Sequence, residues 1–246
     1  MSLCAQEFGR TITDLINQVN LSREQSKAVF SEVLLDKQSA MHQGAFLSAL
    51  AAKGETAEEI AGIWEAIYEY DTCKIALETP YAVVENCGTG MDSLKTYNIS
   101  TAAAIIAAAA GVVMAKHGSR AITSSCGTVD LLENLGIDVE SPPELVKHSI
   151  ETAGIGIFNG MSPYIHQSLG RILSQISFGT VLNIAASLAN PVLPRFAVRG
   201  VYDRALLSPV ARVMKEIGYQ RALVVHGLDA SGKRGMDEAS TIGETL

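Results

Sequence analysis

Residues 81–111 read YAVVENCGTGMDSLKTYNISTAAAIIAAAAG, and this stretch decides the fold. The apolar run from Tyr81 to Cys87 ends at a glycine and is typical of a buried strand. A loop rich in glycine and hydroxyl side chains follows, and small apolar residues from about Thr101 to Ala110 then favour a helix. Strand, glycine-rich loop and helix in this order predict a parallel α/β sheet with an anion site at the loop.

The side chains of the loop suit a phosphate group. Gly88 and Gly90 allow the backbone to approach an anion closely, and the following helix presents unpaired N–H groups to it. Hydroxyl groups that can donate to phosphate follow at Thr89, Thr96, Ser100 and Thr101. Ser100 is also suited to ligate a cation. Asp92 repels phosphate but can orient Mg²⁺ or a donor. We therefore favour a phosphate site over a plain turn.

Two other groups extend this chemistry. Lys116-His117-Gly118-Ser119-Arg120 directly follows an expected strand at 112–115, where cations suit an anionic ligand at a topological switch point. An exposed basic turn has the same composition. The pair Asp237-Glu238 offers oxygen ligands for a hard cation, although such pairs are more often solvated surface.

The chain outside these motifs predicts two domains. Helical patterns occupy 9–20, 22–36, 40–52 and the residues after Thr56, and Ser22 with Gln25 forms a capping-box pattern. Residues 1–72 are therefore expected to form a helical domain. Residues 73–246 are expected to form a mainly parallel α/β domain, with strands at 81–87, 112–115, 197–201 and 222–225 and helices at 101–110, 130–135, 142–152, 180–189 and 208–217.

Composition narrows the class of protein. Apolar residues make up 48% of the chain, which suits a sizeable core, and charged residues make up 18%. The net charge of −7 makes nucleic-acid binding unlikely, because such proteins usually carry a basic face. The four cysteines have no zinc-like spacing and are expected to be free thiols in a reducing cytoplasm. The longest apolar stretch, 102–115, is too short for a membrane span.

The ordered motifs resemble those of the anthranilate phosphoribosyltransferases and, more distantly, the pyrimidine nucleoside phosphorylases. The likeness runs from about Leu21 to Ser240 and includes the GTGxD…TxNIST loop, the KHGxR turn, Leu188-Ala189-Asn190-Pro191 and the late Asp237-Glu238. The NIST string favours the transferase branch. The resemblance implies a helical domain joined to an α/β domain, a cytoplasmic homodimer formed through the helical domain, and a cleft that holds 5-phosphoribosyl 1-diphosphate (PRPP) with Mg²⁺.

By motif position, the resemblance also implies residue roles, without assigning a catalytic residue. Mg²⁺ would be held by Ser100 at one site and by Asp237 with Glu238 at a second. The acceptor, an aromatic amine such as anthranilate, would meet His117, Ser119 and Arg171. The PRPP-binding set would be Gly88, Thr89, Gly90, Asp92, Thr96, Asn98, Ser100, Thr101 and Lys116.

The sequence departs from the family pattern mainly on the acceptor side. Met91 fills a glycine position of GTGGD, and Ser119 replaces the asparagine of KHGNR. The arginine that would pair with the anthranilate carboxylate falls at Leu173, which leaves Arg171 as the nearest surrogate. Family members also continue past the Asp-Glu motif, whereas this sequence stops at Leu246. Either the gene is truncated or the missing sheet elements are supplied otherwise, and an incomplete sheet would leave an exposed apolar face and an unpaired edge.

Three functions remain open at this point. The first is transfer of phosphoribose from PRPP to anthranilate or a related amine, a step of tryptophan biosynthesis. The second is a pyrimidine nucleoside phosphorylase, which would use phosphate and a nucleoside instead. The third is a non-catalytic relative that kept the fold and binds nucleic acid or a protein partner.

Overall fold

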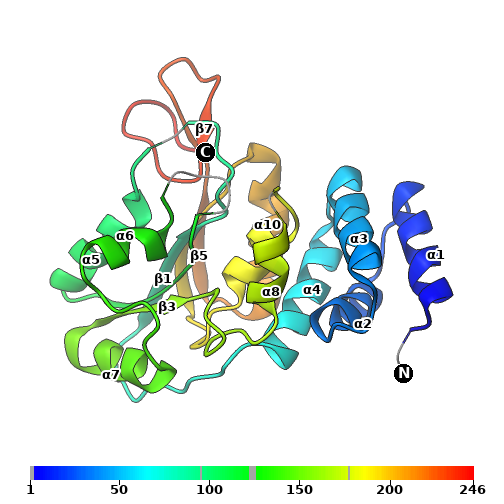
Figure 1. Cartoon of the computed structure of the whole chain (residues 1–246). Helices are drawn as coiled ribbons and strands as arrows, with labels where there is room; N and C mark the ends of the chain where they lie inside the picture. Colours follow the sequence, from blue (N-terminus) through cyan, green and yellow to red (C-terminus); the bar gives the residue numbers. More distant parts are fainter. Residues whose placement is uncertain (1–2, 95, 122–125, 177) are drawn as a thin grey trace.

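The computed structural model describes residues 3–94, 96–121, 126–176 and 178–246. A bundle of helices lies beside an α/β unit, with α8 (Leu169–Gln175) and α10 (Leu207–Ile217) between them (Figure 1). The main sheet is parallel throughout, with strand order β3-β2-β1-β4-β5. Its strands are β1 Val83–Gly88, β2 Val113–Gly118, β3 Ile155–Asn159, β4 Phe196–Gly200 and β5 Arg221–Val225. The predicted fold class is therefore confirmed.

The N-terminal helices form where their capping signals predict. The helices are α1 Ala5–Ile16, α2 Arg23–Leu34, α3 Ala40–Lys53 and α4 Ala57–Tyr70. At the start of α2 the Ser22 hydroxyl accepts the Gln25 N–H at 3.2 Å, and the Gln25 side chain accepts the Ser22 N–H at 2.8 Å. The predicted capping box is thus present, and it satisfies two N–H groups that the helix cannot pair itself. None of the helices in the described part of the chain is long and apolar enough to cross a bilayer.

One hydrophobic core joins the bundle to the α/β unit. Buried residues run without a break from α1–α4 into α9 (Leu182–Ala185), α10 (Leu207–Ile217) and β4. The Trp64 indole N–H of α4 donates to the Leu188 carbonyl at 3.1 Å. The two parts are thus held by packing as well as by hydrogen bonds.

The helices of the α/β unit cover the sheet unequally. One face packs on α7 (Pro143–Ala153) and α10. The contact with α7 is close, because a Cβ on Gly156 of β3 would lie 2.8 Å from the Val146 carbonyl. The other face carries α5 (Ile99–Ala109) over β1, β2 and β3. Val198 of β4 and Leu223 of β5 pair on this second face and are 40% and 65% exposed. Exposed apolar side chains of the sheet therefore lie at the edge strand β5 and on its neighbour β4.

The sequence missed several elements and shifted others. Strand β3, helix α8 (Leu169–Gln175) and the small pair β6 (Gly227–Leu228) and β7 (Gly235–Met236) were not predicted. The helix expected at 180–189 is instead the short α9 followed by a 3-10 turn at Ala186–Leu188. Helix α6 at Thr128–Asn134 begins two residues earlier than expected. Short elements of this kind depend on tertiary packing more than on local periodicity.

The contact between α2 and α4 gives a test of the bundle. A Cβ on Gly62 would lie 2.2 Å from the Arg23 carbonyl oxygen, a backbone atom that cannot turn away. Gly62→Ala should therefore lower the free energy of unfolding by about 1–3 kcal/mol, measured by urea denaturation. The matched control is Gly44→Ala in α3, where a Cβ meets nothing within 4 Å. This control should raise stability by up to about 1 kcal/mol, since alanine favours the helix. Equal effects of the two changes would contradict this packing.

Candidate active site

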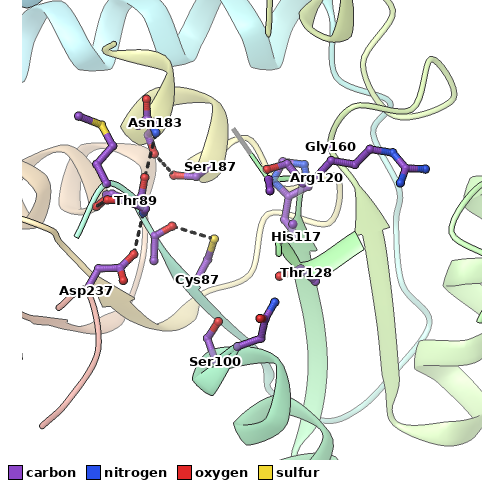
Figure 2. A pocket seen from close by; sticks show the side chains of 18 of the residues that line it. Cys87, Thr89, Ser100, His117, Arg120, Thr128, Gly160, Asn183, Ser187 and Asp237 are labelled. Atoms are coloured by element: carbon purple, nitrogen blue, oxygen red, sulfur yellow. Dashed lines mark hydrogen bonds between the residues drawn. The ribbon is translucent and has the colours of Figure 1, made fainter. Parts of the chain in front are cut away.

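A cavity of about 230 Å³ opens at the carboxyl ends of β1 and β2. Figure 2 shows Thr89, Asn183 and Asp237 on one side of it and His117, Arg120 and Gly160 on the other. The structure brings twelve of the fourteen predicted site residues into its lining: Gly88, Thr89, Gly90, Asp92, Thr96, Asn98, Ser100, Lys116, His117, Ser119, Asp237 and Glu238. Most of the residues that the sequence singled out separately therefore share one cavity.

Two glycines at adjacent strand ends make room for the acidic pair. Gly88 of β1 and Gly200 of β4 are paired in the sheet. A Cβ on Gly88 would lie 2.0 Å from the Asp237 carboxylate, and one on Gly200 would lie 1.5 Å from the Asp237 carbonyl. The chain after β7 thus crosses directly over both strand ends. It is held there by the Gly90 N–H, which donates to Asp237 at 2.6 Å.

The neighbouring Met91 has φ +70°, a left-handed conformation that costs a non-glycine residue about 1 kcal/mol or more. Its Cε lies where a Cβ on Gly179 would be, at 1.9 Å. The bulky side chain that replaces the third glycine of the GTGGD motif is thus accommodated by a glycine in the facing segment.

Lys116 supplies a buried positive charge behind the loop. Its Nζ donates to the Asn86 carbonyl at 2.7 Å and to the Ser100 hydroxyl at 3.1 Å, and the residue is 1% exposed. Burial lowers the pKa of the ammonium group. The Asn86 amide in turn donates to the Ser100 carbonyl at 2.7 Å. The first turn of α5 is therefore tied to strands β1 and β2 beside the cavity.

The carboxylates face the N-terminus of α5. Glu238 accepts the Ser100 N–H at 3.1 Å. Burial first, and then the charge of Asp237, raise the pKa of Glu238 to about 7, with a smaller contribution from Asp92. Anionic groups brought this close favour a shared cation. Among the described residues no three His, Cys, Asp or Glu side chains form a metal cluster by themselves.

The opposite wall of the cavity is mainly apolar. It is formed by Gly160, Leu169, Leu173, Leu182, Ala186 and Ser187. The His117 ring borders this wall and is 4% exposed. Burial first, and then the positive charge of Arg199, lower its pKa to about 4, so the ring is neutral at pH 7. This wall suits a flat apolar group.

Arg171 and Thr101 do not occupy the predicted positions. Arg171 turns toward the bundle, where its guanidinium donates to the Val33 carbonyl at 2.8 Å and lies 3.2 Å from Asp36. It is absent from the cavity lining, whereas Leu173 is part of it, so the structure does not place Arg171 where the sequence predicted it. Thr101 is fully buried, and its hydroxyl lies 3.1 Å from that of Thr128. Its side chain joins α5 to α6 instead of facing a ligand.

Sequence reasoning missed Asn183 as a site residue. Its side-chain amide donates to the Thr89 carbonyl at 3.1 Å, and its side-chain oxygen accepts the Thr180 N–H at 3.0 Å. It thereby joins the glycine loop to the apolar wall, as Figure 2 shows. The available signal was a single amide in the apolar run from Thr180 to Ala189.

Comparison with known proteins now identifies the family. The model of the glycosyl transferase family a/b domain matches residues 80–246, and that of the helical bundle domain matches residues 10–70. The anthranilate phosphoribosyltransferase of Methanothermobacter marburgensis is 41% identical over 242 residues, which are 97% of this chain and 68% of the relative. The chain belongs to the anthranilate phosphoribosyltransferase family. A relative of the same name from Methanosarcina acetivorans is 43% identical over 230 residues, which are 92% of this chain and 60% of that protein.

Solved structures of the family share the fold. The enzyme from Thermus thermophilus superposes with a TM-score of 0.79 at 30% identity, covering 96% of this chain and 72% of that one. The Saccharomyces cerevisiae enzyme, described in complex with PRPP and Mg, gives 0.81 at 25% identity, with coverage of 98% and 70%. This chain thus corresponds to roughly two thirds of the length of these family members.

The buried His117 predicts a pH dependence of stability. The folded protein keeps this ring neutral down to about pH 4, whereas the unfolded chain binds a proton below its ordinary pKa of 6.5. The unfolded state therefore binds more protons between these values, and the free energy of unfolding should fall by roughly 3 kcal/mol as pH drops from 6.5 to 4. Urea denaturation of wild type and His117→Gln at both pH values isolates this contribution. A stability difference between the two proteins that does not change with pH would contradict it.

Because Arg171 turns toward the bundle, its replacement should lower stability without changing the affinity for the acceptor. Arg171→Ala should lower the free energy of unfolding by about 1–3 kcal/mol, because the Val33 carbonyl and Asp36 lose a charged partner. The affinity for anthranilate should stay within about twofold of wild type. The matched control is Leu173→Ala, two residues away, which removes part of the cavity wall and should weaken anthranilate binding. Calorimetry in which Arg171→Ala weakens anthranilate binding and Leu173→Ala does not would return Arg171 to the acceptor site.

Proposed function

We propose that this chain transfers 5-phosphoribose from PRPP to the amine of an aromatic acceptor, with anthranilate as the first candidate. The observation that carries the proposal is the cavity itself. A glycine-rich loop, a buried lysine and an acidic pair line one side of it, and leucine side chains line the other. Family membership supports the same reaction, since the relatives in Methanothermobacter and Methanosarcina carry the name anthranilate phosphoribosyltransferase.

The donor half suits a pyrophosphate. The first turn of α5 borders this side of the cavity, with its Ser100 N–H bonded to Glu238, and Lys116 places a positive charge 3.1 Å from the Ser100 hydroxyl. Glycines at 88 and 90 leave the loop backbone open to the ligand. We assign PRPP to this side of the cavity.

Mg²⁺ fits between the donor and the acidic pair. Asp237, Glu238 and Ser100 offer hard oxygen ligands, and a substrate pyrophosphate would provide the others. When bound, the metal would stabilise the negative charge that grows on the leaving pyrophosphate. Its positive charge would also offset the burial and the charge of Asp237, which together raise the pKa of Glu238.

The chemistry needs little from the protein beyond positioning. The bond between ribose C1 and the pyrophosphate oxygen breaks, the bond between C1 and the amine nitrogen forms, and the amine loses one proton. The loop would hold the donor while the apolar wall holds the acceptor ring. Little more translational and rotational freedom would then be lost when the two react. His117 stays neutral at the boundary between them.

The domain roles extend this proposal. Residues 1–72 would form the dimerising helical unit and residues 73–246 the unit that binds PRPP, in keeping with the separate family models for 10–70 and 80–246. Homodimer formation and a cytoplasmic location stay predictions. Size-exclusion chromatography with light scattering measures the first directly.

Calorimetric titration of PRPP tests the function. With Mg²⁺ present, the folded wild type should bind PRPP, and Ser100→Ala should weaken binding by about tenfold, the loss of one charge-assisted contact. Without Mg²⁺, Ser100→Ala should match wild type, because the contact runs through the metal. The matched variant Lys116→Met should lose affinity under both conditions, since its charge acts directly. No heat from folded wild type would exclude PRPP, and equal losses in Ser100→Ala with and without metal would exclude it as a metal ligand.

A further inference from the structure

One turn of the acceptor wall brings two polar side chains to the cavity. Leu182, Asn183, Ala186 and Ser187 all belong to the lining, because residues three and four positions apart share one face of a helical turn. Asn183 and Ser187 are half-buried, whereas Leu182 and Ala186 are buried. A ring that packs on Leu182 and Ala186 therefore lies next to Ser187.

The proton of the Ser187 hydroxyl is committed to the protein backbone. Its oxygen lies 2.8 Å from the Asn183 carbonyl oxygen and 2.9 Å from that of Ile184. Figure 2 shows the first of these contacts as a dashed line. Carbonyl oxygens can only accept, so the hydroxyl must donate its single hydrogen to them. Ser187 therefore has no hydrogen left to offer a bound molecule.

Arg199 occupies one lone pair of the same hydroxyl. Its Nη1 donates to the Ser187 hydroxyl at 3.0 Å, and its Nη2 donates to the Ser187 carbonyl at 2.9 Å. The arginine is 1% exposed, and the buried Glu85 carboxylate lies 3.8 Å from it. A hydroxyl oxygen has two lone pairs, so one remains free. Neither Arg199 nor Ile184 lines the cavity, so their contacts lie on the protein side of Ser187 and leave the free lone pair on the cavity side.

The neighbouring Asn183 is not selective in this way. Its side-chain N–H donates to the Thr89 carbonyl at 3.1 Å, and its side-chain oxygen accepts the Thr180 N–H at 3.0 Å. An amide group has two N–H hydrogens and two lone pairs, so one of each stays free. Asn183 can therefore meet either a donor or an acceptor, whereas Ser187 can meet only a donor.

We propose that Ser187 is a specificity-determining residue that accepts an N–H of the acceptor amine. The inference rests on the proposed transferase function and names the group that the second substrate must carry, a nitrogen with a free hydrogen. A donating hydroxyl would bind the lone pair of that nitrogen, which is the pair that must form the bond to ribose C1. An accepting hydroxyl holds the nitrogen through its hydrogen and leaves this pair free to react.

The same contact should strengthen during the reaction. The amine nitrogen gains positive charge while its bond to C1 forms, so its N–H becomes a better donor to Ser187. An interaction that is stronger in the transition state than in the ground state raises kcat. Ser187→Ala should therefore lower kcat with anthranilate by about tenfold, with the affinity for PRPP within about twofold of wild type.

Calorimetric titration with two ligands of nearly equal shape tests the recognition without turnover. Anthranilate keeps one N–H free when the other turns to its own carboxylate. Salicylate has a single O–H, which turns to the carboxylate and leaves only lone pairs facing outward. Wild type should bind anthranilate about tenfold more tightly than salicylate. In Ser187→Ala the two affinities should agree within about twofold, and Ser187→Thr, which keeps the hydroxyl, should restore the preference.

A matched variant of the same turn separates recognition from a general disturbance of the wall. Leu182→Ala removes apolar packing only, so it should weaken both ligands alike and keep the preference. A preference that is unchanged in Ser187→Ala would overturn the proposal. So would a wild type that does not favour anthranilate over salicylate, a comparison that decides the question even where the variant fails to fold.

The failure of this inference can be told from the failure of the transferase. Wild type that shows the expected ligand preference but transfers no phosphoribose would sink the proposed function alone. Active enzyme in which Ser187→Ala leaves both kcat and the ligand preference unchanged would overturn the role of Ser187 and leave the transferase standing.

Discussion

The site depends on one close crossing of the chain. Parallel strands β1 and β4 end side by side at Gly88 and Gly200, and the segment after β7 passes over both at distances that leave no room for a Cβ. This crossing places Asp237 against the Gly90 N–H and Glu238 against the first turn of α5. A side chain at either glycine would push the acidic pair away from the loop, so the pairing of the two strand ends and the position of the acidic pair depend on the same contact.

A second constraint lies beneath the acceptor wall. Glu85 on β1 is fully buried and accepts from the Asn190 amide and the Tyr219 hydroxyl, both at 3.0 Å. Arg199 lies 3.8 Å from the same carboxylate and donates to both the carbonyl and the hydroxyl of Ser187. A buried charge pair of this kind contributes little net stability but tolerates few alternative arrangements. The turn that carries Ser187 is therefore fixed from below by strands β1 and β4.

The sequence predicted the parts of this protein that local patterns encode. Ser22 with its capping-box pattern and Thr56 as a cap mark two helix starts, and the glycine loop after β1 predicts an anion site. It could not predict the direction of Arg171, because two positions along a short helix separate a cavity-facing side chain from one that reaches the bundle. Likewise His166 carried no local signal, since its meaning arises from a contact with His117 across 49 residues.

These constraints differ between the two halves of the site, and the difference bears on specificity. The donor half is built from backbone N–H groups, paired glycines and Lys116, whose positions follow from the sheet itself. The acceptor half is built from side chains on short helices, and its ring neighbour His117 is held through residues that belong to other parts of the fold. A change of acceptor therefore needs only side-chain substitutions at positions such as Leu173 or Ser119. A change of donor would require the strand ends themselves to move. This asymmetry accounts for a chain that keeps the phosphate motifs of its family and departs from them at the acceptor wall.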